Sequence, residues 1–127
     1  EKEGLLDRKN RISKENRLQK VYALNEKGRN ALKESIEEIL SNPEHTQWRV
    51  DIGIYNSSLL SRRQIKKALT RYRKELEKKI GEYNGLLDFL RSSECPAYRL
   101  EVAKRPIFLL EGELKWIDEY VSTLGRQ

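Results

Sequence analysis

The sequence predicts a mainly α-helical protein: a β-hairpin followed by a helix, then a long antiparallel helical hairpin used for dimerisation. Apolar residues recur at spacings of three and four from position 65 to 90, and at alternating spacings of three and four from 100 to 124. Residues 18–24 are rich in strand-forming types. Charged residues make up 36% of the chain and hydrophobic residues 37%, which suits helices with wide solvated faces and narrow apolar stripes.

Residues 5–24 are the predicted β-hairpin. Leu18, Tyr22 and Leu24 fall on one face of its second arm, at the period of two that a strand imposes. The polar segment 13–16 lies between the arms and forms the turn, although it lacks the Asn-Gly pair typical of tight hairpins.

Asn25 is a favourable N-cap, so we expect a helix from Glu26 to about Ser41, which Pro43 ends. Its apolar residues share one face. Residues 44–60 fit two patterns. Val50, Ile52 and Ile54 alternate as in a strand, whereas Trp48, Ile52 and Tyr55 are spaced as in a short helix. We expect a short, irregular helix there.

The clearest pattern is that of the two long helices. Ser61 and Gln64 fit a capping box that begins a helix of about 30 residues. After a break at residues 92–96, a second long helix reaches about Leu124, and Pro106 is expected to kink it. Two long helices with so short a connection pack antiparallel. The expected core and dimer residues are Ile65, Leu69, Tyr72, Leu76, Ile80, Ile107, Leu110, Leu114, Trp116, Ile117, Tyr120 and Val121.

A second apolar strip on the last helix, formed by Leu109, Trp116 and Tyr120, suggests a further partner, for which we expect the same hairpin of a second chain. The chain is thus expected to divide into residues 1–41, an irregular connector of residues 42–60, and a dimerisation domain of residues 61–127.

The basic hairpin is the main candidate for function. Residues 8–20 hold six basic side chains against one acidic side chain, and the whole chain carries a net charge of +6. Long cationic side chains on a hairpin suit contacts with DNA phosphates, although a charge run can also be a solvated face. The predicted phosphate contacts are Lys9, Arg11, Lys14, Arg17 and Lys20.

Residues 62–79 are a rival DNA-binding patch, with nine basic and two acidic side chains. These basic residues surround the apolar seam instead of gathering on one face. In an antiparallel hairpin they also face the acidic residues of the last helix, which neutralise part of their charge. The hairpin at residues 8–20 is therefore preferred.

Trp116 and Trp48 could line a pocket for a small aromatic ligand, although interface packing is the preferred interpretation of Trp116. His45 is the only histidine and a poor metal candidate, so no metal or cofactor is expected. No catalytic motif is present, and the chain is not expected to be an enzyme. Cys95 stands alone, which is compatible with a cytoplasmic location, and no apolar run is long enough to span a membrane.

Two segments resemble the PadR family of transcriptional regulators. Residues 3–6 and 20–29 flank the basic insert and are similar to the family's wing, whose second strand typically ends Y-x-L-T-x-x-G-R, with Asn25 in place of the usual threonine. Residues 111–117 resemble an E-x-x-W segment of the family's last helix. Together the two segments extend the resemblance over essentially the whole chain.

The resemblance implies a dimeric repressor that binds operator DNA through a winged helix-turn-helix, and some members respond to phenolic or drug-like ligands. About three helices should precede the wing, and the chain lacks an initiator methionine. We therefore expect it to begin inside a longer protein, and we do not expect this part alone to bind DNA specifically. The alternatives are a dimeric helical interaction module without DNA binding and a MarR-like ligand-responsive regulator.

Overall fold

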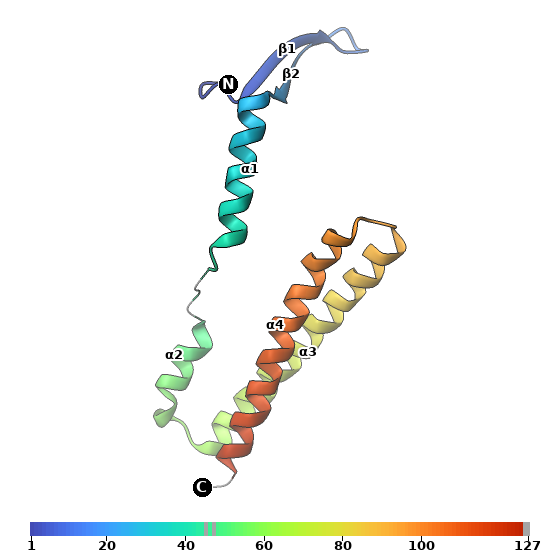
Figure 1. The fold of residues 1–127 in the computed structure, drawn as a ribbon. Helices are drawn as coiled ribbons and strands as arrows, with labels where there is room; N and C mark the ends of the chain where they lie inside the picture. The colour runs from blue at the N-terminus through green and yellow to red at the C-terminus, as the bar shows by residue number, and fades with distance from the viewer. Residues whose placement is uncertain (45, 47, 126–127) are drawn as a thin grey trace. The chain divides into compact units, whose positions relative to one another are not determined.

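A computed structural model describes residues 1–44, 46 and 48–125, and the chain forms two compact units, residues 1–47 and 48–127 (Figure 1). The elements are β1 (Leu6–Ile12), β2 (Leu18–Leu24), α1 (Glu26–Ser41), α2 (Arg49–Tyr55), the 3-10 helix η1 (Ser57–Leu59), α3 (Arg62–Ser92) and α4 (Ala97–Leu124). The predicted fold class is confirmed, because a β-hairpin comes first and two long antiparallel helices come last. No helix in the described part of the chain is long and apolar enough to cross a membrane.

Strands β1 and β2 pair antiparallel, from Leu6 opposite Leu24 to Ile12 opposite Leu18. The turn between them works without an Asn-Gly pair because Asn16 has a φ of 60°, in the left-handed region that asparagine tolerates. The Asn16 N–H donates to the Ser13 carbonyl, and the Ser13 N–H donates to the Arg17 carbonyl. This is the bonding pattern of a three-residue hairpin loop.

Asn25 joins the hairpin to α1. Its side-chain oxygen accepts a hydrogen bond from the Gly28 N–H, as an N-cap should, at 2.9 Å. Its side-chain nitrogen donates to the Gly4 carbonyl at 2.8 Å and to the Asp7 carboxylate at 3.3 Å. A threonine hydroxyl could cap the helix but has one donor hydrogen instead of two. Asn25 therefore also links the segment before β1, and β1 itself, to the start of α1.

Gly28 is the buried residue of α1, and its lack of a side chain lets the helix approach the hairpin. A Cβ at this position would lie 2.1 Å from the Leu5 carbonyl oxygen and 2.9 Å from Leu24 Cδ2. The Leu5 carbonyl belongs to the backbone, so it cannot move aside as the end of a flexible side chain could. Close packing of α1 against the hairpin therefore requires a glycine at position 28.

We expect Gly28→Ala to destabilise the hairpin–α1 unit by about 1–3 kcal/mol, the usual cost of overpacking. This outcome opposes helix propensity, which favours alanine over glycine by about 1 kcal/mol. Gly81→Ala in α3 is the matched control, because nothing lies within 4 Å of its Cβ position, and it should stabilise. Chemical denaturation followed by circular dichroism measures both, and a Gly28→Ala chain as stable as the Gly81→Ala chain would contradict the packing argument.

Helices α3 and α4 pack side by side through two apolar clusters. Leu69, Leu76 and Ile117 form the cluster near the chain's C-terminus, and Leu87, Ala103 and Ile107 form the one near the connection between the helices. The capping box of Ser61 and Gln64 is confirmed. Helix α4 continues through Pro106 as one element. Each hairpin core residue expected from the sequence is buried or half-buried within the single chain.

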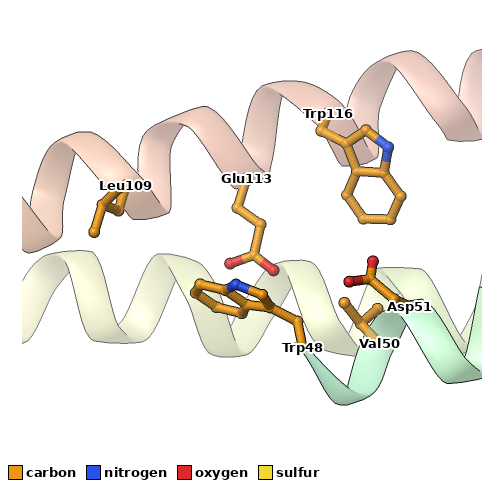
Figure 2. Close-up of a pocket in the computed structure, with 6 residues that line it drawn as sticks. All are labelled: Trp48, Val50, Asp51, Leu109, Glu113 and Trp116. Carbon is orange, nitrogen blue, oxygen red and sulfur yellow. The ribbon is translucent and has the colours of Figure 1, made fainter. Parts of the chain in front are cut away.

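The predicted connector helix forms as α2 and η1. These elements belong to the same unit as α3 and α4, and Val50 and Asp51 of α2 face Trp116 of α4 (Figure 2). The apolar face of α1, by contrast, is exposed. Its members are Leu32, Ile36, Ile39 and Leu40.

Candidate nucleic-acid interface and pocket

The strand register divides the five predicted phosphate contacts between the two faces and the tip of the hairpin. Lys9 and Arg11 share one face, because they lie two positions apart on β1. Lys20 pairs with Asn10 and lies on the opposite face. Lys14 and Arg17 belong to the turn. All five side chains are exposed, but the structure does not gather them into one cluster.

Most of the positive charge of this hairpin is not compensated within it. Arg17 pairs with Glu15 at 4.0 Å, and both side chains are largely exposed, so the pair contributes little. Arg11 Nε donates to the side-chain oxygen of Gln19 at 3.4 Å, which leaves its charge in place. Within residues 1–44, 46 and 48–125, Lys9, Lys14 and Lys20 form no ion pair. The hairpin therefore presents a cationic surface on both faces.

The face that carries Lys20 also carries Arg8 and Asn10, and its other residues are apolar. Ile12 and Leu18 are paired next to the turn, and Tyr22 and Leu24 continue the face toward α1. All four side chains are exposed in this chain. The sequence pattern identified this face correctly.

The rival basic patch at the start of α3 is partly neutralised. Arg73 Nε donates to the Asp118 carboxylate at 2.9 Å, and another nitrogen of Arg73 contacts Glu77. The hydrogen bond from Arg73 lowers the pKa of Asp118, and the bond to Asp118 raises the pKa of Arg73. The expected pairing of α3 basic residues with α4 acidic residues is thus present at this position.

A pocket of about 330 Å³ lies between α2 and α4 (Figure 2). Trp48, Val50 and Asp51 line it from the start of α2, and Leu109, Glu113 and Trp116 line it from α4. The Trp116 ring stacks on Tyr120, with centroids 5.8 Å apart. The two tryptophans singled out in the sequence therefore border the same pocket, and the ligand expected there remains a prediction.

Tyr72 of α3 lines a second pocket and contacts Glu113 of the first. Its hydroxyl donates a hydrogen bond to Glu113. The second pocket is a mostly apolar cavity of about 190 Å³, which Tyr72 lines together with Val50, Ile54 and Tyr120. Burial raises the pKa of the Tyr72 phenol well above its usual value, and the hydrogen bond to Glu113 and the charges of Glu113 and Asp51 raise it further.

We expect the phenol of Tyr72 to resist ionisation above pH 10, the ordinary pKa of a tyrosine. Because the folded-state pKa of Tyr72 is raised, the folded protein keeps a proton that the unfolded chain releases. The unfolding free energy should therefore fall as the pH rises above about 10. Ultraviolet absorbance of phenolate measures the titration, and Tyr72→Phe should remove the resistant group. Ionisation of all six phenols together would contradict this placement.

Sequence reasoning missed the two acids of the pocket. Glu113 is one of the acidic residues of the last helix that were expected to face the basic residues of α3, and Asp51 lies in the ambiguous connector. A usable signal was present, because Trp48 and Asp51, and likewise Glu113 and Trp116, are three positions apart and share a helix face. Among the described residues, no three His, Cys, Asp or Glu side chains gather as a metal site, and His45 lies outside those residues.

Comparison with known proteins gives a likeness of fold. No family model and no curated protein matches the chain. The crystal structure of Bacillus subtilis PadR in complex with operator DNA has a TM-score of 0.76 at 18% identity, covering 97% of this chain and 72% of that one. The structure of smu.1604c from Streptococcus mutans UA159 has a TM-score of 0.63 at 16% identity, covering 95% and 71%. The chain therefore has a PadR-like winged-helix fold, as its two motifs predicted.

Proposed function

We propose that the chain is the wing and dimerisation portion of a PadR-type transcriptional regulator, a cytoplasmic repressor that binds operator DNA as a homodimer and is not an enzyme. The observation that carries the proposal is the similarity of fold over 97% of the chain to a PadR solved on operator DNA, together with the cationic hairpin within the matched region. In this proposal the hairpin is the wing.

The distribution of charge over the hairpin suits a groove of duplex DNA. Phosphates line both walls of a groove, so a hairpin that enters it needs cations on both faces and at its tip. Lys9 and Arg11 would meet one wall, Lys20 the other, and Lys14 and Arg17 the phosphates nearest the tip. Such contacts hold the protein in position and carry no base specificity.

The proposed dimer uses the second apolar strip of α4. Tyr98 and Val102 extend the strip that Leu109 and Trp116 begin, since all four lie within about 40° around the helix at 100° per residue. Residues of α2 border the strip at Leu109 and Trp116, whereas Tyr98 and Val102 are 70% and 69% exposed. A second copy of the hairpin would cover this exposed part. We include in the proposal a small effector that occupies the tryptophan pocket.

Fluorescence anisotropy with labelled duplexes tests the wing assignment on the 127-residue chain. We expect weak binding without sequence preference and with a steep salt dependence. Arg11→Glu with Arg17→Glu should weaken binding to every sequence alike, by about tenfold or more at low salt. The slope of log affinity against log salt should fall by about two, one for each lost phosphate contact.

Lys78→Glu with Lys79→Glu in α3 is the matched control, because it reverses the same charge outside the hairpin. That variant should bind DNA nearly as well as the unaltered chain. Equal losses in the two variants would contradict a special role of the hairpin, because Lys78 and Lys79 belong to the rival patch. No binding at any salt concentration would favour a helical interaction module that does not bind DNA.

A further inference from the structure

The pocket of Figure 2 combines two indoles with two carboxylates. Glu113 extends from α4 toward the Trp48 ring, and Asp51 extends from α2 toward the Trp116 ring. The acids thus come from two different elements and project into the space between the two aromatic side chains. Val50 and Leu109 supply apolar lining.

The two acids of this pocket, Asp51 and Glu113, have no ion-pair partner among the described residues. Arg73, which follows Tyr72 in α3, pairs with Glu77 and Asp118 instead. The hydroxyl of Tyr72 bonds Glu113 but brings no charge. The pKa of Tyr72 is raised first by burial and then by Glu113 and Asp51. The negative charges of both acids therefore act on the Tyr72 phenol.

We propose that this pocket binds an organic cation, a quaternary ammonium or protonated amine carried on a compact apolar body. Indole faces attract cations, and the attraction grows as water is excluded. Carboxylates on opposite sides would complement the charge, and a volume of about 330 Å³ suits a small molecule. The same acids would repel a phenolic carboxylate. This inference rests on the effector included in the proposed function and names its chemical class.

Benzyltrimethylammonium and phenylacetate are suitable probes, because they share an aromatic ring and carry opposite charges. Binding to the 127-residue chain is measured by isothermal titration calorimetry and by tryptophan fluorescence. Trp48 and Trp116 are the only tryptophans, so a fluorescence change reports the pocket directly. The cation is expected to bind and to change the fluorescence, and the anion is expected to do neither.

Substitutions of the acids separate charge from shape. Glu113→Gln and Asp51→Asn should each weaken cation binding by about fivefold to tenfold, since each removes one charge and keeps the side-chain outline. Glu111→Gln is the matched control, because this acid is exposed on α4 and does not line the pocket. Trp48→Leu should weaken binding by about threefold to thirtyfold. Thermal unfolding of each variant shows whether the fold is kept, and Glu113→Gln retains an acceptor for Tyr72.

Three results would overturn the inference: no binding of the cation up to millimolar concentration, equal affinity for the anion, or unchanged affinity in both acid variants. Because no DNA is present in these titrations, they are independent of the wing assignment. A chain that binds DNA and no cation would retain the regulator proposal and lose this ligand. The converse result would retain the pocket and lose the DNA-binding role.

Discussion

Replacement of Ile117 by alanine is expected to destabilise the helical hairpin by about 2–5 kcal/mol, the range measured for large-to-small changes at buried aliphatic positions. Ile117 is 1% exposed and packs with Leu69 and Leu76 of α3. The described residues include only six buried hydrophobic side chains, so no neighbouring core can compensate for a cavity at this one. A loss of this size is a large fraction of the total stability of a small domain.

The matched control is Ile52→Ala in α2, which removes the same atoms from a side chain that is 64% exposed. It should change the unfolding free energy by less than about 0.5 kcal/mol. Urea denaturation at one fixed protein concentration measures both variants, so that any change in association affects them equally. Similar small losses in the two variants would contradict the packing of α3 against α4 through Ile117.

Introducing charge into the exposed part of the α4 strip is expected to abolish the proposed dimer. Tyr98→Glu with Val102→Glu places two carboxylates where a second chain would bury apolar surface, and unpaired charges at an interface are costly. The unaltered chain should sediment at twice its mass of 15.0 kDa at micromolar concentration, and the variant at 15.0 kDa.

Tyr55→Glu with Leu59→Glu is the control for this prediction. It changes an aromatic and an aliphatic residue at the same spacing, and both are even more exposed. This control should remain dimeric. A monomeric unaltered chain would remove the dimer from the proposal, and a dimeric Tyr98→Glu, Val102→Glu chain would move the interface elsewhere, with the exposed face of α1 as the next candidate.

Periodicity was sufficient to predict the helices, because each long helix has one apolar face that must be buried. The start of α1 at Glu26 and the start of α3 after Ser61 also followed from local capping chemistry. These features depend on residues within a turn or two of each other. They could therefore be predicted without knowing the tertiary structure.

The candidate sites depend on longer-range geometry and were predicted less completely. The separation of Lys20 from Lys9 and Arg11 follows from the pairing register, which the positive φ of Asn16 and the loop length determine. Trp116 shares a pocket with residues of α2 of the same chain, an element whose pattern was ambiguous. For the same reason, the acids of the pocket could not be assigned from spacing within either helix alone.

Directed cleavage of DNA tests the wing assignment most directly. Glu15→Cys at the tip of the hairpin and Lys67→Cys in α3 would each carry an iron–EDTA label in a Cys95→Ser background, which removes the only native thiol. Cleavage of a bound duplex from the label at position 15, with little from the label at position 67, is the predicted result. Cleavage from position 67 alone would assign DNA contact to the α3 patch and contradict the wing.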